Sequence, residues 1–126
     1  YTAVAEKGAF LNGKRIHVNK ETELLRTFVG GSVKHLAALG VSGHVLRSLG
    51  CCALELCWVA SGKFGARVKL RGNDPHGYGA SACVLAEAGG MLTDTKGQKY
   101  TLRSDGAITS NGKLHQKLLN LINNTS

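Results

Sequence analysis

Long apolar runs are missing from this sequence of 126 residues. No stretch approaches the roughly 18 consecutive apolar residues of a transmembrane helix, so the sequence predicts no membrane-spanning segment. Aromatic residues make up only 6%, which leaves few rings for stacking on nucleic-acid bases. Runs of five basic residues are absent, which argues against a disordered basic arm. The hydrophobic content of 43% is sufficient for one compact domain spanning residues 1–126.

Acidic residues are also few. Eight Asp and Glu face sixteen Lys and Arg, which gives a formal net charge of +8. A basic surface of this kind needs no partner to account for it. It also suits a polyanion, either RNA or a phosphorylated ligand. The sequence leaves both interpretations open.

The four cysteines do not have the spacing of a metal site. Cys51, Cys52, Cys57 and Cys83 lie in apolar, helix-like segments and form neither a C-x-x-C pair nor a zinc ribbon. Adjacent cysteines rarely pair with one another in a disulfide. We therefore expect reduced thiols in an intracellular protein, in the cytoplasm or an organelle matrix.

The apolar pattern alternates between the periods of strands and helices. It predicts strands over 1–7, 15–18, 24–29, 45–47, 66–70, 91–93, 100–102 and 107–109, and helices over 33–39, 49–61, 78–88 and 114–122. Asn12-Gly13 is a strong hairpin signal because both residues tolerate positive φ. Strands that alternate with helices after an opening hairpin predict an α/β fold with a mixed, partly parallel sheet flanked by helices.

Five segments, in order, carry a family resemblance. They are residues 8–13 (GAFLNG), 46–54 (LRSLGCCAL), 59–62 (VASG), 86–94 (AEAGGMLTD) and 110–115 (SNGKLH). Together they resemble the C-terminal half of the inositol monophosphatase family of metal-dependent sugar phosphatases. The resemblance covers nearly the whole chain and implies the fold of that family's C-terminal subdomain.

The resemblance also implies what is missing. In that family a further half of the chain carries a Glu-Glu pair and an Asp-Pro-x-Asp-Gly-Thr segment, and these carboxylates bind magnesium ions that activate a water for attack on phosphorus. Neither motif occurs here. The sequence begins with Tyr1 rather than Met, close to where the family's C-terminal half begins. We expect either a processed start or a piece of a longer chain.

Several acidic positions of the family are altered. Gly77 stands where the family places a metal-binding Asp, and His76 replaces the preceding Trp. Asp74 lies three residues before Gly77 and could not take over without a local shift of the chain. Lys69 falls near an acidic position that contacts substrate hydroxyls in some members, and Gly65 replaces another Asp. We therefore expect no metal, no cofactor and no catalytic residue in this chain, with magnesium confined to the family's active members.

Phosphate binding is a separate matter. The turn that contains Gly50, Cys51 and Cys52 begins the most regular predicted helix, and free N–H groups at such a position attract anions. Lys69 is a candidate for the same ligand. His76 could serve as a general base, but the sequence places neither a nucleophile nor an orienting carboxylate beside it. The other histidines, His17, His35, His44 and His115, are expected in surface or packing roles.

Three functions fit these observations. The first is an inactive phosphatase-like domain used for binding or scaffolding. The second is a piece of a magnesium-dependent inositol or sugar phosphate phosphatase that needs its other half. The third is a basic structural protein in a nucleic-acid assembly. In each case an uncovered sheet face predicts a homo-oligomer or a partner chain.

Overall fold

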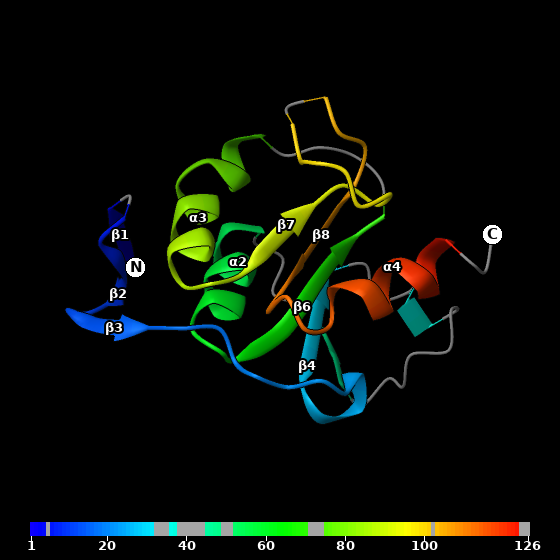
Figure 1. Ribbon diagram of the computed structural model, residues 1–126, viewed down its shortest axis with the longest axis horizontal. Coiled ribbons are helices and arrows are strands. Elements are labelled where there is room, and N and C mark those ends of the chain that lie inside the picture. Colours follow the sequence, from blue (N-terminus) through cyan, green and yellow to red (C-terminus); the bar gives the residue numbers. More distant parts are fainter. Residues whose placement is uncertain are drawn as a thin grey trace.

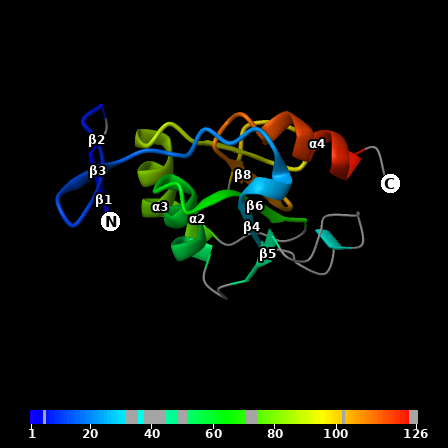
Figure 2. The same cartoon turned by 90° about the horizontal axis from the view of Figure 1, so that it is seen from below.

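The computed structural model describes residues 1–4, 6–31, 36–37, 45–48, 52–70, 75–101 and 103–123. Its elements stack in four layers (Figure 1): a small sheet, a pair of helices, a larger sheet and a final helix. The view from below shows the same order (Figure 2), with β1 and α4 at opposite ends. Within the described residues, no helix has both the length and the apolar character needed to cross a bilayer.

The small sheet is an antiparallel meander. It consists of β1 (Thr2–Val4), β2 (Gly8–Leu11) and β3 (Lys14–Ile16), in that order. The turn between β2 and β3 has positive φ at both of its central residues, 51° at Asn12 and 81° at Gly13. These are the backbone angles that the right-handed twist of a two-residue hairpin requires. The predicted hairpin is therefore confirmed.

The larger sheet is mixed. Its strands are β4 (Phe28–Gly31), β5 (Leu46–Arg47), β6 (Phe64–Lys69), β7 (Met91–Thr93) and β8 (Ala107–Ser110). They lie in the order β5-β4-β6-β8-β7, and β4 runs parallel to both β5 and β6. β8 is antiparallel to β6 and β7. The prediction of a partly parallel α/β fold is confirmed.

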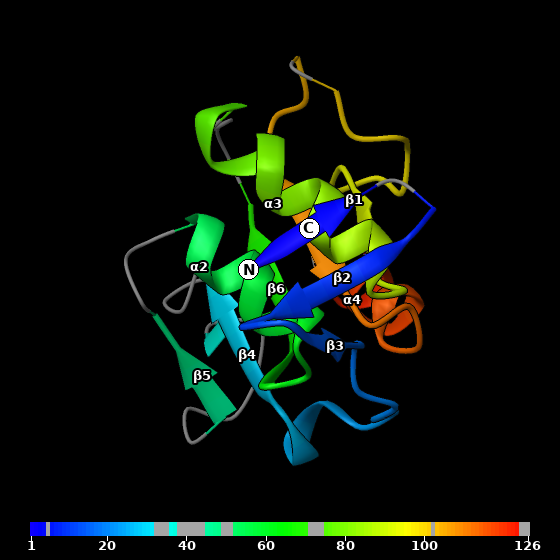
Figure 3. The same ribbon diagram turned by 90° about the vertical axis from the view of Figure 1, so that its left-hand side faces the viewer.

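Helices cover both faces of the larger sheet. α2 (Cys52–Ala60) and α3 (Pro75–Glu87) pack side by side between the two sheets, and α4 (His115–Asn123) covers the opposite face. The small sheet lies over α3 (Figure 3). α3 begins at Pro75, three residues before the predicted start, because proline is well suited to the first helical position.

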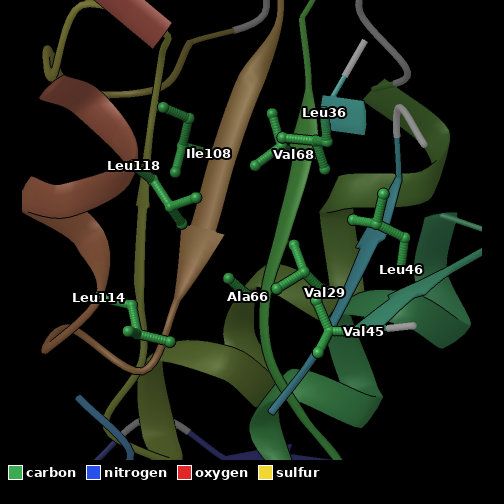
Figure 4. Close-up of a cluster of buried hydrophobic side chains, with 9 residues drawn as sticks. All are labelled: Val29, Leu36, Val45, Leu46, Ala66, Val68, Ile108, Leu114 and Leu118. Atoms are coloured by element: carbon green, nitrogen blue, oxygen red, sulfur yellow. The ribbon is translucent and has the colours of Figure 1, made fainter. Parts of the chain in front are cut away.

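Two apolar cores result from this layering. The core between the larger sheet and α4 (Figure 4) contains Val29, Leu36, Val45, Leu46, Ala66, Val68, Ile108, Leu114 and Leu118. The core around α2 and α3 contains Ala9, Cys57, Val59, Ala60, Phe64, Val84, Leu85 and Ala88. Ala9 comes from the small sheet, so the second core joins three layers.

The strand predicted over 24–29 is wrong at both ends. Residues Leu24–Arg26 form a 3-10 turn, η1, and β4 begins only at Phe28. The strand then continues through Gly30 and Gly31, which were predicted to end it. Gly31 has φ +101°, and a Cβ there would collide with the carbonyl of Val68 on β6. A glycine lets the two strands approach this closely, so the sequence signal for a break reflects a close contact.

The strand predicted over 100–102 is also wrong. Tyr100 and Thr101 belong to no strand, and Leu102 lies outside the described residues. Among the described residues of this segment, pairing is limited to one bridge between Thr93 and Lys99. The carboxylate of Asp94 accepts a hydrogen bond from the amide of Gln98 at 2.9 Å, which holds the intervening segment as a turn. Of the helix predicted over 33–39, residues 36–37 are described and helical.

Residues 87–90, which we call the EAGG segment, begin with an acidic residue that connects α3 to the small sheet. Glu87 accepts hydrogen bonds from the amide of Glu6 at 3.0 Å and from that of Gly8 at 2.8 Å. The bond from Gly8, then that from Glu6, lowers the pKa of this carboxyl below its ordinary value of 4.5, and Arg15 adds to the effect. Glu87 therefore joins two layers through its charged form.

We predict that substitution of Glu87 by Gln frees this corner of the small sheet. The amides of Glu6 and Gly8 should then exchange with solvent faster, while α4 amides keep their protection, as measured by hydrogen exchange. Because the folded pKa is depressed, the wild-type contribution is present above pH 4.5 and is lost as the pH falls through the lowered pKa. Unchanged exchange at Gly8 in the variant would contradict this role.

Candidate functional site

The parallel strands define where a ligand site is expected. β4, β5 and β6 end at the same edge of the larger sheet, and α2 and α3 follow β5 and β6 from that edge. We call it the carboxyl edge. The connection from β4 to β5 includes Leu36, which packs in the core on the α4 side, whereas α2 crosses on the other face. Such a reversal leaves a crevice at the strand ends where ligands of open α/β sheets bind.

The sequence-predicted candidates converge on this edge as far as the structure describes them. Lys69 is the last residue of β6, and Cys52 is the first residue of α2. His76 and Gly77 lie in the first turn of α3. For the last three, the backbone alone is described. Gly50 and Cys51 lie outside the described residues.

The end of β4 presents bare backbone close to the cation of Lys69. Gly30 pairs with Arg47 on one side, and Gly31 pairs with Val68 on the other, one residue before Lys69. Side chains alternate along a strand, so Lys69 is on the same face of the sheet as Arg67, toward α2 and α3. Lys69 is half-buried and has no ion-pair partner among the described residues. This arrangement favours an anion.

A buried ion pair sits directly behind the edge. Arg67 donates from Nε to Oε1 of Glu55 at 2.9 Å, and the two side chains are 7% and 4% exposed. The second carboxylate oxygen lies next to Gly30, where a Cβ would come within 3.1 Å of it. Sequence reasoning missed this pair. The available signals were one charged residue, Glu55, in an otherwise apolar helix, and Arg67 between apolar neighbours in the following strand.

The magnesium that the family resemblance implies does not fit the described residues. Mg²⁺ prefers carboxylate and other oxygen ligands. Glu55 is bound to Arg67, Lys69 is a cation, and Gly77 supplies no side-chain donor. The described residues contain no group of three or more His, Cys, Asp or Glu able to hold a metal. Asp74 lies outside the described residues.

His115 forms a separate polar cluster on the α4 side of the sheet. It is buried, with Nδ1 2.8 Å from Ser110 Oγ and Nε2 2.7 Å from Thr93 Oγ1. Thr93 donates its one hydroxyl proton to the carbonyl of Asp94, so Nε2 carries the proton and Nδ1 accepts from Ser110. Ser110 Oγ in turn accepts from the amide of Gly112. The neutral ring satisfies every partner, which makes His115 a structural link to α4.

We predict that this link weakens in acid. Burial lowers the pKa of His115 below its ordinary value of 6.5, so below pH 6.5 the unfolded chain takes up the proton before the folded chain does. The free energy of unfolding should fall with pH in that window, by at most about 1.4 kcal/mol per pH unit from this group.

Denaturant titrations across that window, compared with those of a His115→Asn variant, measure the contribution of the ring. An equal slope in both proteins would contradict the prediction. The imidazole shifts of the wild-type protein, followed by NMR, give the same answer if the variant does not fold.

A cavity of about 700 Å³ lies at the opposite edge of the parallel strands. It is lined by Asn19, Lys20, Glu21, Arg26, Thr27, Phe28, Val45, Gly62 and Lys63, which precede or begin β4, β5 and β6. We call it the amino-edge cavity. Sequence reasoning did not anticipate it, because its lining comes from four separate segments of the chain.

Comparison with known proteins supports the family. The model of the inositol monophosphatase family matches residues 1–126. Inositol monophosphatase 2 of Solanum lycopersicum is 31% identical over 136 aligned residues, which cover 98% of this chain and 51% of that protein. The solved inositol monophosphatase of Thermotoga maritima superposes with a TM-score of 0.83 at 31% identity, covering 97% of this chain and 50% of that chain. The structure from Anabaena gives a TM-score of 0.86 at 22% identity, covering 97% and 53%.

The chain belongs to the inositol monophosphatase family. It spans about half the length of the curated relatives that it matches. The predicted family and fold are therefore confirmed.

Proposed function

We propose that this chain binds a phosphate ester at the carboxyl edge and does not hydrolyse it, as a binding or scaffolding half of the family fold. The observation that carries the proposal is Gly77 in the first turn of α3, where the family resemblance implies a metal-binding Asp. The nearest described carboxylate on α2, that of Glu55, is bound to Arg67. Among the described side chains at this edge, none is thus available to hold a metal for water activation.

The same edge retains features that suit a phosphate. Lys69 supplies a positive charge at the end of β6, and the end of β4 has no side chain to obstruct a ligand. The first turns of α2 and α3 point toward the same edge, and their amide groups and helix dipoles favour anions. These contacts bind and orient a phosphate. None of these contacts is a general base that could activate a nucleophile, so the phosphate ester is bound without being hydrolysed.

Calorimetric titration tests this proposal. Inorganic phosphate and an inositol monophosphate should both bind, and the affinity for each should be the same with and without Mg²⁺. No phosphate should be released. Lys69→Ala should weaken binding several-fold. The matched variant Lys14→Ala, on the exposed strand β3, removes the same charge and should have no effect. Release of phosphate that requires Mg²⁺ would overturn the proposal.

A second candidate is a partial phosphatase that becomes active with its missing half. It is favoured by the coverage, since the matched relatives are about twice as long. We predict that mixing this chain with the N-terminal half of an active relative yields no turnover with the wild type or with Gly77→Asn. Gly77→Asp should gain magnesium-dependent phosphate release, because it restores a carboxylate ligand.

The outcomes of this assay separate the two candidates. Turnover by the wild-type chain in the mixture would support the partial phosphatase and overturn the inactive domain. No turnover by any variant removes support for the partial phosphatase.

We also propose that the uncovered face around α2 joins another chain, either a second copy or a partner that completes the fold. Leu54 on α2 is 38% exposed and Tyr1 before the edge strand β1 is 37% exposed. Light scattering after size exclusion should show a dimer or larger species, and Leu54→Glu should reduce it. A monomer at high concentration would contradict self-association.

A further inference from the structure

The amino-edge cavity combines several cations with an exposed aromatic ring. We propose that it binds a nucleotide, with the phosphate held by Lys20, Arg26 and Lys63 and the base placed against the ring of Phe28. The site lies at the other end of the parallel strands from Lys69 and Gly77, so it is independent of the function proposed above. Charge, an exposed ring, a fixed frame and size support it in turn.

Charge identifies the phosphate. Lys20, Arg26 and Lys63 are exposed, and none forms an ion pair with a described residue. Among the described residues of the lining, the carboxylate of Glu21 is the one acidic group, and its Oε1 accepts from the amides of Thr22 and Glu23. These described residues therefore carry an excess of two positive charges. A phosphomonoester with a charge of about −1.5 to −2 matches this excess.

The ring identifies the second part of the ligand. Phe28 is 43% exposed, although it begins a central strand of the sheet. Its ring is held edge-on against Phe64, with centroids 6.4 Å apart, and the guanidinium carbon of Arg47 lies 4.4 Å from its centroid. A large ring fixed in this way at the wall of a cationic cavity offers a surface for a planar base.

The frame of the cavity is fixed by one amide. Asn19 donates from Nδ2 to the Gly62 carbonyl at 3.1 Å and to Thr27 Oγ1 at 3.3 Å. Its Oδ1 accepts from the amide of Glu21 and from Nδ2 of Asn111, 92 residues further along the chain. These bonds join three of the four segments of the lining, which are 19–21, 26–28 and 62–63. A ligand consequently meets walls that are already in place, which lowers the entropic cost of binding.

The size of the cavity agrees with this ligand. Its volume of about 700 Å³ is in the range of roughly 300–1,000 Å³ that small-molecule sites occupy. A nucleotide can reach it either as a free molecule or as one unit of a single-stranded nucleic acid. Both sources present the same phosphate and base, so they are separated by experiment.

Titrations of the intact chain, followed by calorimetry and by the fluorescence of the single Trp58, test the proposal. Adenosine monophosphate should bind more tightly than either inorganic phosphate or adenosine. Lys20→Ala and Arg26→Ala should each weaken binding about tenfold. Lys14→Ala, the matched control on β3, should leave it unchanged. Phe28→Leu should reduce the affinity for the nucleotide to that for phosphate alone, and Phe28→Tyr should restore it.

Several results would overturn the proposal. They are equal affinity for phosphate and nucleotide, an equal loss in Lys14→Ala and Lys20→Ala, and the absence of any binding. Loss of nucleotide binding in Lys69→Ala, with Lys20→Ala unaffected, would assign the ligand to the carboxyl edge instead. Failure of phosphate esters to bind at Lys69 leaves these outcomes intact, so the two proposals fail separately.

Titration with a single-stranded oligoadenylate distinguishes the two sources of the nucleotide. Tighter binding than that of the mononucleotide, with an affinity that falls steeply with salt and less steeply in Lys20→Ala, assigns the cavity to single-stranded RNA. Equal or weaker binding assigns it to the free nucleotide.

Discussion

The buried ion pair of Glu55 and Arg67 is the contact on which the arrangement of layers depends. It is the polar link between α2 and the central strand β6, and both side chains are almost fully removed from water. Loss of one partner would leave an uncompensated buried charge, at a cost of about 3–5 kcal/mol in comparable cases. The carboxylate of Glu55 in this pair also lies beside Gly30, at the end of β4. The same interaction that positions α2 therefore withdraws an acidic group from the carboxyl edge.

The EAGG segment shows how a family signature can serve the fold alone. Glu87 holds the small sheet through two backbone amides, and the amide of Gly90 closes the helix on the carbonyl of Leu85 at 2.9 Å. A Cβ at Gly90 would overlap the side chain of Leu85, so glycine is required there for packing. None of these contacts involves Gly77, ten residues earlier. The contacts of this segment therefore do not depend on the residue at position 77.

Local patterns made much of the fold predictable, and long-range contacts account for the errors. The Asn12-Gly13 turn, the strand Met91–Thr93 and the final helix follow from turn chemistry and periodicity, which act over a few residues. The predicted end of the strand over 24–29 was wrong because Gly31 allows a close approach to β6 and does not interrupt the strand. The convergence of the candidate residues was predictable only insofar as the carboxyl ends of parallel strands meet at one edge of a sheet. The link between Asn19 and Asn111 spans 92 residues, and no local pattern signals it.

The edge strands of the larger sheet are short. β5 has two residues and β7 has three, so each leaves few unpaired backbone groups for another chain. Long, flat edges invite strand-to-strand aggregation, and short ones resist it. The larger sheet is consequently a poor template for aggregation by edge-to-edge strand pairing. The association proposed above uses the surface of the small sheet and α2 and needs neither of these edges.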